Sequence, residues 1–317
     1  HCASFRRAFR LPKKCANIDH TMAHTPRTAS ARAGHSPRAA PAPVRGGPRM
    51  DAAPQNAAED IRRYSGDPDF MATLARGLAV VRAFTQQRRP LTIAQLSMKT
   101  GIPRAAVRRC LYTLSELGYV ASDDGRNFTL RPRILALGHA YLTSSPLAAS
   151  AQPILDHVSD TVHESCSMSI LEGDEILYIG RSRTSLRIMS IDLTVGSRLP
   201  AYCTSMGRVL LSGLDPKDLA AYCARVRIVP HTEKTQLSPA KIRAIVEALR
   251  TRDCAIVDQE LEIGLRSISV PVRDAHGRIA AAINISVQAN RVSIPDMEAR
   301  LKPHLLAAAH EPGLLLN

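Results

Sequence analysis

The sequence predicts an α+β protein in which an amino-terminal winged helix-turn-helix is joined by a linker helix to a carboxy-terminal α+β domain. Residues 91–130 carry the pattern of two helices around a tight turn, followed by a short hairpin. Residues 146–317 instead alternate helix-like and strand-like segments. The excess positive charge lies before residue 146. We expect a basic tail at 1–66, a winged helix-turn-helix at 67–130, a linker helix at 131–145 and the second domain at 146–311.

The turn of the helix-turn-helix is marked by residues with strong positional preferences. Thr92 can cap a helix in which Ile93 and Leu96 face inward. Gly101 breaks that helix, and Pro103 suits the first turn of the next one. These signals predict two helices separated by a short turn.

The second of these helices has an apolar back and an arginine-rich front. Its back is formed, at i, i+4 and i+7 spacing, by Val107, Leu111 and Leu114. Arg104 and Arg108 share a different face, with Arg109 beside them. A recognition helix needs this division, because its back packs on its own domain while its front enters a groove of DNA.

A hairpin follows the second helix, with strands around 119–120 and 127–130 and a tight turn at Asp124-Gly125. This winged helix-turn-helix predicts binding to a double-stranded DNA operator. The predicted DNA contacts are Lys99, Pro103, Arg104, Ala105, Arg108, Arg109 and Arg126. We expect Lys99 and Arg126 at phosphate or in the minor groove, whereas the helix arginines could read bases or clamp phosphates.

The charge distribution favours the same interpretation. The chain has 42 Lys and Arg against 28 Asp and Glu, a net charge of +14. Residues 1–66 hold 12 basic and 4 acidic residues, residues 67–145 hold 11 and 5, and residues 146–317 hold 19 of each. A basic half joined to a neutral half suits one module for a polyanion and another for a different ligand.

Helices are expected on both sides of the DNA-binding motif. Residues 67–84 form an apolar stripe at helical spacing, which predicts a further helix of that domain. The stripe consists of Met71, Leu74, Leu78, Val81 and Phe84. After the wing, Pro132 suits the start of a linker helix whose apolar side chains could pair subunits. Those side chains are Ile134, Leu135, Leu137 and Tyr141.

The carboxy-terminal domain is expected to be a mostly antiparallel sheet flanked by helices. Its predicted helices cover residues 148–163, 204–212, 216–225, 239–251 and 295–310. Its predicted strands lie near residues 167–171, 175–179, 186–193, 255–258, 267–272 and 279–287. Gly-containing turns at 172–174 and 274–277 mark two hairpins.

The amino-acid composition predicts a disordered tail and indicates the compartment in which the protein acts. Residues 1–66 are rich in Ala, Arg and Pro with few large apolar side chains, so this tail is expected to be disordered. Since the chain opens with His1, we expect Met50 or Met22 to be the natural start. The sequence contains no uninterrupted apolar run of about 18 residues, so no membrane span is predicted. The seven scattered cysteines form no Cys-x-x-Cys pair, which predicts neither a disulfide framework nor a zinc site and favours the cytoplasm.

Seven segments of the chain carry a family pattern. They are GDPDFMATLARGLAVVRAF, LTIAQL, IPRAAVRRCLYTL, ALGHAYL, LEGDEILYIGRS, GSRLPAYCTSMGRVLL and VDQELEIGLRSISVPV. With them, residues 67–310 resemble the IclR family of bacterial transcription regulators, and within it the β-ketoadipate pathway subgroup. The resemblance implies a homodimer or dimer of dimers with a GAF-like effector domain.

The resemblance also implies a function and a ligand class. Members of this subgroup activate genes for aromatic-acid catabolism on binding a small aromatic or dicarboxylic acid. The implied effectors are protocatechuate, β-ketoadipate and 4-hydroxybenzoate. The alternative is a repressor of the same family that senses another small carboxylic acid.

The effector-binding residues are implied position by position by the same resemblance. They are Met206, Asp258, Glu260, Ser267, Asn284 and Ser286. Asn284 and Ser286 alternate onto one face of their strand, as a period of two requires. Small polar groups there can hydrogen-bond a carboxylate or a phenol without filling a cavity. Arg266 could offset the charge of an anionic effector or pair with Glu260 or Glu262.

Two other classes of protein are weighed against a regulator. An enzyme is disfavoured because the sequence lacks the common nucleophile-elbow, phosphate-loop, zinc-helix and dinucleotide motifs. Only Cys203-Thr204-Ser205 at a helix start resembles an activated nucleophile. A purely architectural DNA-binding protein is disfavoured by the size and neutrality of residues 146–317. We therefore expect no catalytic site and no bound metal or cofactor.

Overall fold

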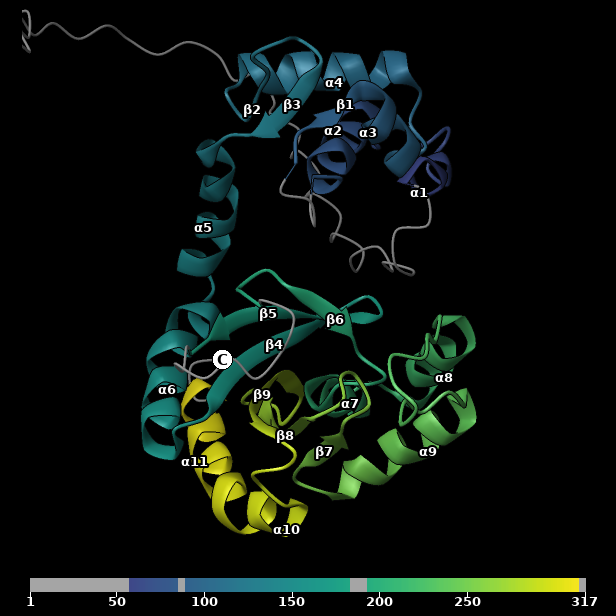
Figure 1. Cartoon of the computed structure of the whole chain (residues 1–317). Coiled ribbons are helices and arrows are strands. Elements are labelled where there is room, and N and C mark those ends of the chain that lie inside the picture. Colours follow the sequence, from purple (N-terminus) through teal and green to yellow (C-terminus); the bar gives the residue numbers. More distant parts are fainter. Residues whose placement is uncertain (1–56, 85–88, 183–192, 314–317) are drawn as a thin grey trace, which may run out of the picture. The chain divides into compact units, whose positions relative to one another are not determined.

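The computed structural model describes residues 57–84, 89–182 and 193–313, with side chains up to residue 310. These residues form an amino-terminal helical domain with a small sheet and a carboxy-terminal α+β domain, which confirms the predicted fold class (Figure 1). The two candidate start methionines, most of the predicted tail and nearly all of the predicted strand at 186–193 lie outside the described residues.

The amino-terminal domain has the predicted helix-turn-helix and wing. Its elements are α1 (Ala57–Arg62), α2 (Ala72–Arg82), β1 (Leu91–Thr92), α3 (Ile93–Thr100), α4 (Arg104–Glu116), β2 (Val120–Ala121) and β3 (Asn127–Leu130). Thr92 caps α3 as predicted, because its Oγ1 accepts from the Gln95 N–H at 3.3 Å. Gly101 ends α3 in the left-handed region, with a φ of 67°. β3 lies between β1 and β2, so the wing contains one strand, β1, that the sequence pattern did not predict.

The start of this domain lies earlier than predicted. Residues 57–66 were assigned to the disordered tail, but α1 is ordered, and its Ala58 and Ile61 pack against the domain core. Two apolar contacts suffice here because α1 rests on an existing core and does not build its own.

The predicted stripe on α2 is wrong in its first half. Met71, Leu74 and Leu78 are exposed, whereas Val80 and Phe84 are buried in the core. The buried face of α2 is made largely of small side chains, including Ala79 and Ala83, that pack against the core. Small residues let this face approach α4 closely, and the larger leucines are left pointing outward.

The predicted linker helix is present. A 3-10 turn, Pro132–Ile134, leads into α5 (Leu135–Ser144), and none of the residues of α5 is buried. Large apolar side chains on it are exposed, namely Leu135, Leu137 and Tyr141.

The carboxy-terminal domain is built on a six-stranded sheet in the order β6-β5-β4-β9-β8-β7, with every neighbouring pair antiparallel. Its strands are β4 (Ser165–Glu172), β5 (Glu175–Arg181), β6 (Arg198–Pro200), β7 (Ala255–Asp258), β8 (Leu265–Arg273) and β9 (Ile279–Gln288). Its helices are α6 (Pro146–Val162), α7 (Ser205–Ser212), α8 (Pro216–Arg225), α9 (Pro239–Ala248) with a 3-10 turn (Leu249–Thr251), α10 (Ile294–Asp296) with a π-helical turn (Met297–Leu301), and α11 (Lys302–Gly313). Within the described part of this domain, the departures from the predicted elements include the short edge strand β6, the 3-10 turn that ends α9 and the break in the last helix.

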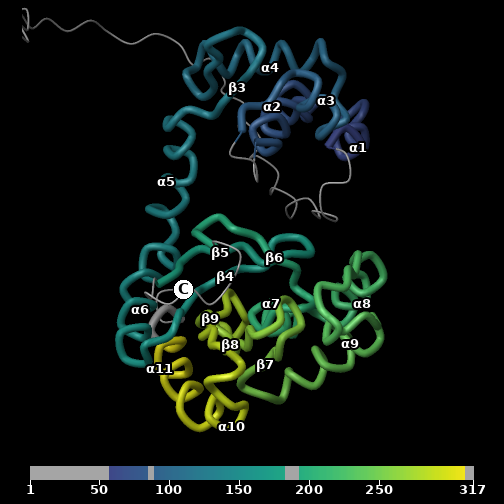
Figure 2. Tube along the Cα trace, in the orientation of Figure 1, coloured from purple at the N-terminus to yellow at the C-terminus, as the bar shows by residue number. Residues whose placement is uncertain are grey.

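Strand alternation gives this sheet two different faces. One face is apolar and packs against α6 and α11 through Cys166, Met168, Ile268, Val270, Ile283 and Ile285. The opposite face is on the side of α7 (Figure 2). By strand alternation and register it carries Ser165, Ser167, Ser169, Ser267, Ser269, Asn284 and Ser286. A polar sheet face against a helix leaves hydrogen-bonding groups inside the domain, which is where a ligand could use them.

No helix in the described part of the chain is both long and apolar enough to cross a membrane.

Candidate functional site

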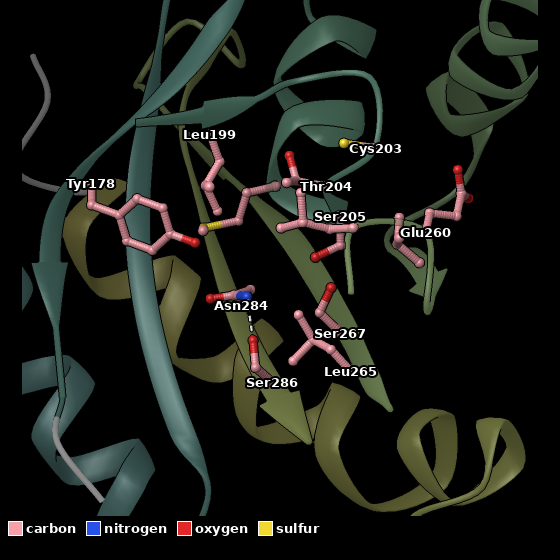
Figure 3. Close-up of a pocket in the computed structure, with 13 residues that line it drawn as sticks. Tyr178, Leu199, Cys203, Thr204, Ser205, Glu260, Leu265, Ser267, Asn284 and Ser286 are labelled. Atoms are coloured by element: carbon pink, nitrogen blue, oxygen red, sulfur yellow. Dashed lines mark hydrogen bonds between the residues drawn. The ribbon is translucent and has the colours of Figure 1, made fainter. Parts of the chain in front are cut away.

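A pocket lies on the serine-bearing face of the sheet, at the first turn of α7 (Figure 3). Its space, including the part open to solvent, is about 370 Å³. The lining residues are Tyr178, Leu199, Cys203, Thr204, Ser205, Met206, Val257, Glu260, Leu261, Leu265, Ser267, Asn284 and Ser286. Apolar and polar side chains contribute about equally to this lining, and polar groups placed beside apolar ones can orient a small molecule.

Two buried polar groups face this pocket without a partner in the described structure. The Asn284 Nδ2 donates to Ser286 Oγ at 3.0 Å, but its Oδ1 accepts no hydrogen bond. The Ser205 Oγ, on the first residue of α7, is likewise unpartnered. Asn284 is 4% exposed and Ser205 is 1% exposed, so bulk water does not satisfy them. A buried group left unpaired costs about 1–3 kcal/mol, which a polar ligand could recover.

The hydroxyl of Tyr178 is a further polar group at the pocket (Figure 3). Burial raises the pKa of Tyr178, so the hydroxyl stays protonated and can donate a hydrogen bond. Burial also raises the pKa of the Cys203 thiol to about 12. A thiol at neutral pH is a poor nucleophile, so Cys203-Thr204-Ser205 lacks the activation that covalent catalysis needs.

Of the residues that line the pocket, only Glu260 carries a formal charge. Its Oε2 lies 2.7 Å from Nη2 of Arg208, and the N–H of Gln236 donates to the same oxygen at 3.0 Å. Arg208 is itself buried and does not line the pocket. The carboxylate is therefore balanced by a guanidinium from behind the pocket wall.

The structure brings five of the six predicted effector residues to this pocket. They are Met206, Glu260, Ser267, Asn284 and Ser286. Asp258 does not belong to the lining, because alternate residues of β7 face opposite sides and Val257 takes the pocket side. The Asp258 carboxylate instead accepts from Arg266 Nε at 2.7 Å. The partner of Arg266 is thus Asp258, which differs from both expectations for it, an anionic effector or the carboxylates at 260 and 262.

Among the polar lining residues, the effector-site prediction missed Tyr178, Thr204 and Ser205. Tyr178 lies on β5 directly opposite Ser169 of β4, so it shares the polar face only through the hairpin register. The serines at 165, 167 and 169 alternate along the preceding strand, so this strand together with the predicted hairpin turn at 172–174 was the available signal, although neither strand shows the contact alone. Ser205 follows the helix cap Thr204, whose side chain accepts from the Gly207 N–H.

The predicted DNA-reading face is exposed on α4 and at the wing. The guanidinium groups of Arg104, Arg108 and Arg109 form no hydrogen bond or ion pair within the described structure. The back of the helix is buried at Val107 and Leu111. Pro103, Ala105 and Arg126 are exposed as well.

Two further side chains, Lys99 and Tyr112, bear on the predicted DNA-reading face. Lys99 Nζ donates to the Ala83 carbonyl at 3.3 Å, beyond the end of α2, so part of its hydrogen-bonding capacity is already used. Tyr112, which sequence reasoning did not select, is exposed one turn after Arg108 on α4.

Two family models match the chain. The IclR helix-turn-helix domain matches residues 73–124, and the bacterial transcriptional regulator IclR C-terminal domain matches residues 139–313. The chain belongs to the IclR family of bacterial transcription regulators. It is thus a DNA-binding regulator with an effector domain, and the resemblance found in the sequence is confirmed.

Individual members of the IclR family are similar over most of their length. The Pca regulon regulatory protein of Pseudomonas putida is 54% identical over 254 residues, which cover 80% of this chain and 87% of that protein. The p-hydroxybenzoate hydroxylase transcriptional activator of Acinetobacter baylyi is 34% identical, with 82% and 95% covered. A solved transcriptional regulator from Rhodococcus sp. RHA1 is 45% identical, with 77% and 97% covered and a TM-score of 0.67. These relatives place the chain among the IclR-family regulators of aromatic catabolism.

Proposed function

We propose that the protein activates genes for aromatic-acid catabolism by binding an operator through α4 and a small acid in the pocket beside α7. The acid is protocatechuate, β-ketoadipate or 4-hydroxybenzoate. The observation that carries the proposal is the pocket itself, in which Ser205 Oγ and Asn284 Oδ1 are buried and unpartnered. The names of the two curated relatives, a Pca regulon regulator and a p-hydroxybenzoate hydroxylase activator, supply the class of acid.

The position of the acid follows from the polarity of the lining. The first N–H groups of α7 have no partner within the helix and form its positive end, so the carboxylate of the acid belongs at Ser205. Its other polar group then faces Asn284 and the Tyr178 hydroxyl. As the ligand of a regulator, the acid is proposed to be bound and released unchanged, in keeping with the protonated state that burial favours for the Cys203 thiol.

Operator recognition is assigned to Arg104 and Arg108, which project from the same face of α4. A base-reading arginine contributes about 1–3 kcal/mol of discrimination, whereas a phosphate contact mainly changes the salt dependence. The protein is proposed to act in the cytoplasm as a homodimer or a dimer of dimers, so that two such helices read two half-sites.

The test uses the full chain and an operator selected from a random duplex library. Arg104→Ala and Arg108→Ala should each weaken binding to the selected operator by about tenfold or more relative to random duplex. Lys217→Ala removes an exposed basic residue of α8 and should leave binding unchanged.

Calorimetric titration with the three acids, and with succinate and benzoate as controls, should show saturable binding of one of the three. Two arginine variants with unaltered affinity and specificity would refute the recognition face, and a chain that binds none of the acids would refute the effector class.

A further inference from the structure

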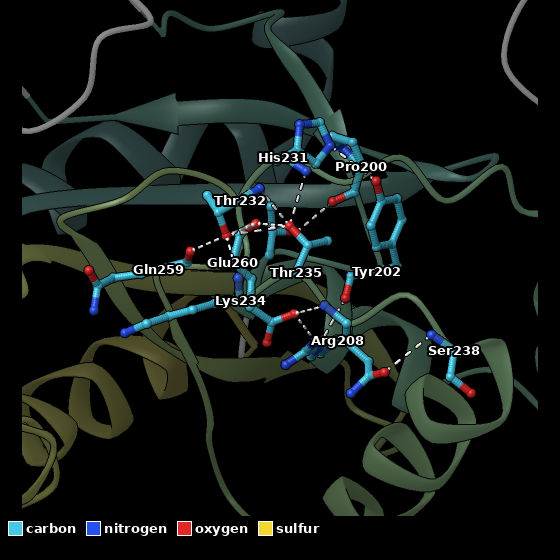
Figure 4. Close-up of polar contacts among 12 residues, drawn as sticks. Pro200, Tyr202, Arg208, His231, Thr232, Lys234, Thr235, Ser238, Gln259 and Glu260 are labelled. Atoms are coloured by element: carbon cyan, nitrogen blue, oxygen red, sulfur yellow. Dashed lines mark hydrogen bonds and ion pairs between the residues drawn. The ribbon is translucent and has the colours of Figure 1, made fainter.

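The ion pair between Arg208 and Glu260 is built into the wall of the pocket (Figure 4). The Arg208 side chain is 5% exposed and that of Glu260 is 13% exposed. Arg208 Nε also donates to the carbonyl of Tyr202, just before α7, at 3.0 Å. A buried guanidinium needs such partners, because leaving it unpaired in the interior is costly.

The loop that carries Glu260 is held in place by its backbone. Gln259 has a φ of 61°, a left-handed conformation that a non-glycine residue adopts only when its surroundings enforce it. Thr232 Oγ1 donates to the Gln259 carbonyl at 2.7 Å, and Thr235 Oγ1 donates to the Glu260 carbonyl at 2.6 Å (Figure 4). These two hydrogen bonds fix the backbone at Gln259 and Glu260, and the Glu260 carboxylate is thereby held against Arg208.

This arrangement is unusual for a pocket that receives an acid. Among the described lining residues there is no Lys, Arg or His, and the one charge is a carboxylate of the same sign as the ligand. Arg208, behind the pocket wall, is the cation paired with this carboxylate. An entering carboxylate must therefore either forgo a cation or compete with Glu260 for the guanidinium.

We propose that Glu260 competes with the carboxylate of the effector for the Arg208 guanidinium. The pairing of Glu260 with Arg208 then sets how strongly the pocket favours anions over neutral molecules of the same shape. This rests on the proposed function, since it presupposes that a small acid binds here. Replacing Glu260 by an amide leaves an oxygen for the Gln236 N–H and releases the charge of Arg208 toward the pocket. Replacing Arg208 instead leaves the Glu260 charge uncompensated.

The test compares acids with their amides, which have nearly the same shape and no charge. Full-length protein is titrated calorimetrically with 4-hydroxybenzoate and 4-hydroxybenzamide, and with adipate and adipamide. Glu260→Gln should raise the preference for acid over amide by about tenfold or more, and Arg208→Gln should lower it by a similar factor, as expected for one charge at close range in a poorly screened site. Because the two variants act in opposite directions, either one that folds is a test by itself.

Two control variants distinguish an effect of charge on the preference for acid over amide from a structural effect of the substitutions. Asp258→Asn removes a carboxylate two residues away that lies outside the pocket, and should leave the preference unchanged. The Arg208→Gln/Glu260→Gln double variant should return the preference to near that of the wild type. If Glu260→Gln and Arg208→Gln each alter acid and amide binding by the same factor, the pair is merely structural and the proposal fails. If no acid binds to the wild type or to Glu260→Gln, the proposed effector class itself is wrong.

Discussion

At the scale of single residues, one carboxylate organises the tip of the wing. Asp124 Oδ1 accepts from the N–H groups of Arg126 at 2.8 Å and Asn127 at 2.7 Å, and Oδ2 accepts from Asn127 Nδ2 at 2.6 Å. These hydrogen bonds hold the pKa of Asp124 well below its usual range. The ionised side chain therefore orients Arg126, which we propose as a DNA contact.

This leads to a prediction about pH. Because the folded pKa of Asp124 is lowered, its contribution to the wing is fully present above the unfolded pKa of about 4 and is lost as the pH falls toward the folded value. The amide NMR signals of Arg126 and Asn127 should accordingly stay unchanged from pH 7 to about 4 and shift only as the pH approaches the lowered folded pKa. In Asp124→Ala these signals should already differ at pH 7, whereas in the neighbouring Asp123→Ala they should not. Identical wing spectra for the two variants would contradict the role of Asp124.

The face that a residue occupies could be predicted where a strand has a clear period, but not where strand pairing decides it. Asn284 and Ser286 face the pocket as alternation requires. Asp258 was wrong by one position, and on a strand one position is enough to turn a side chain to the other face. Tyr178 was missed because its neighbour Ser169 lies on another strand, and the sequence of either strand alone does not show that contact.

At the scale of elements, α7 is held close to the chain segment before it. A Cβ at Gly207 would lie 2.2 Å from the carbonyl oxygen of Ala201 and 2.4 Å from its Cα. Both contacts are to backbone, so a side chain could be accommodated only by moving the start of α7. That start carries Thr204, Ser205 and Met206 of the pocket.

Gly207→Ala should therefore impair both stability and effector binding. We expect a loss of about 1–3 kcal/mol in the free energy of unfolding, as for other overpacked sites. Acid binding should weaken as well, because Ser205 moves with the helix. Gly77→Ala in α2 meets no atom within 4 Å and should leave the protein as stable or slightly more stable. Urea denaturation and calorimetric titration of both variants measure the two effects, and equal stabilities would exclude the close contact.

Most helices and strands could be predicted from periodicity and capping residues, but the buried face of α2 could not. Two overlapping patterns fit its sequence, one through Leu74 and Leu78 and another through Val80 and Phe84. Hydrophobicity favours the first, whereas packing against α4 selects the second. A sequence pattern shows that a helix has an apolar side, but not which partner that side finds.

At the scale of the whole molecule, the described chain leaves large apolar side chains uncovered on two helices. On α5 no residue is buried, and on α2 the leucines at 74 and 78 are exposed. A ten-residue helix without packing partners is marginal in water, so α5 needs a contact that a single chain does not provide within its described part. A second copy of the chain is the partner that the proposed two-fold operator recognition requires.

Charged substitutions on α5 should separate the subunits. Leu137 and Tyr141 lie one turn apart, and their replacement by Glu keeps a good helix former while placing two like charges in the contact. We expect Leu137→Glu/Tyr141→Glu to halve the mass measured by light scattering during size exclusion. We also expect operator binding to weaken by at least about a hundredfold, since two linked half-site contacts become independent. Leu237→Glu is the matched control, because Leu237 is 52% exposed against 54% for Leu137 but lies in the effector domain. A wild type that is already monomeric, or a double variant with unchanged mass, would show that α5 does not join the subunits. In that case effector binding would have to reach the DNA-binding domains within a single chain.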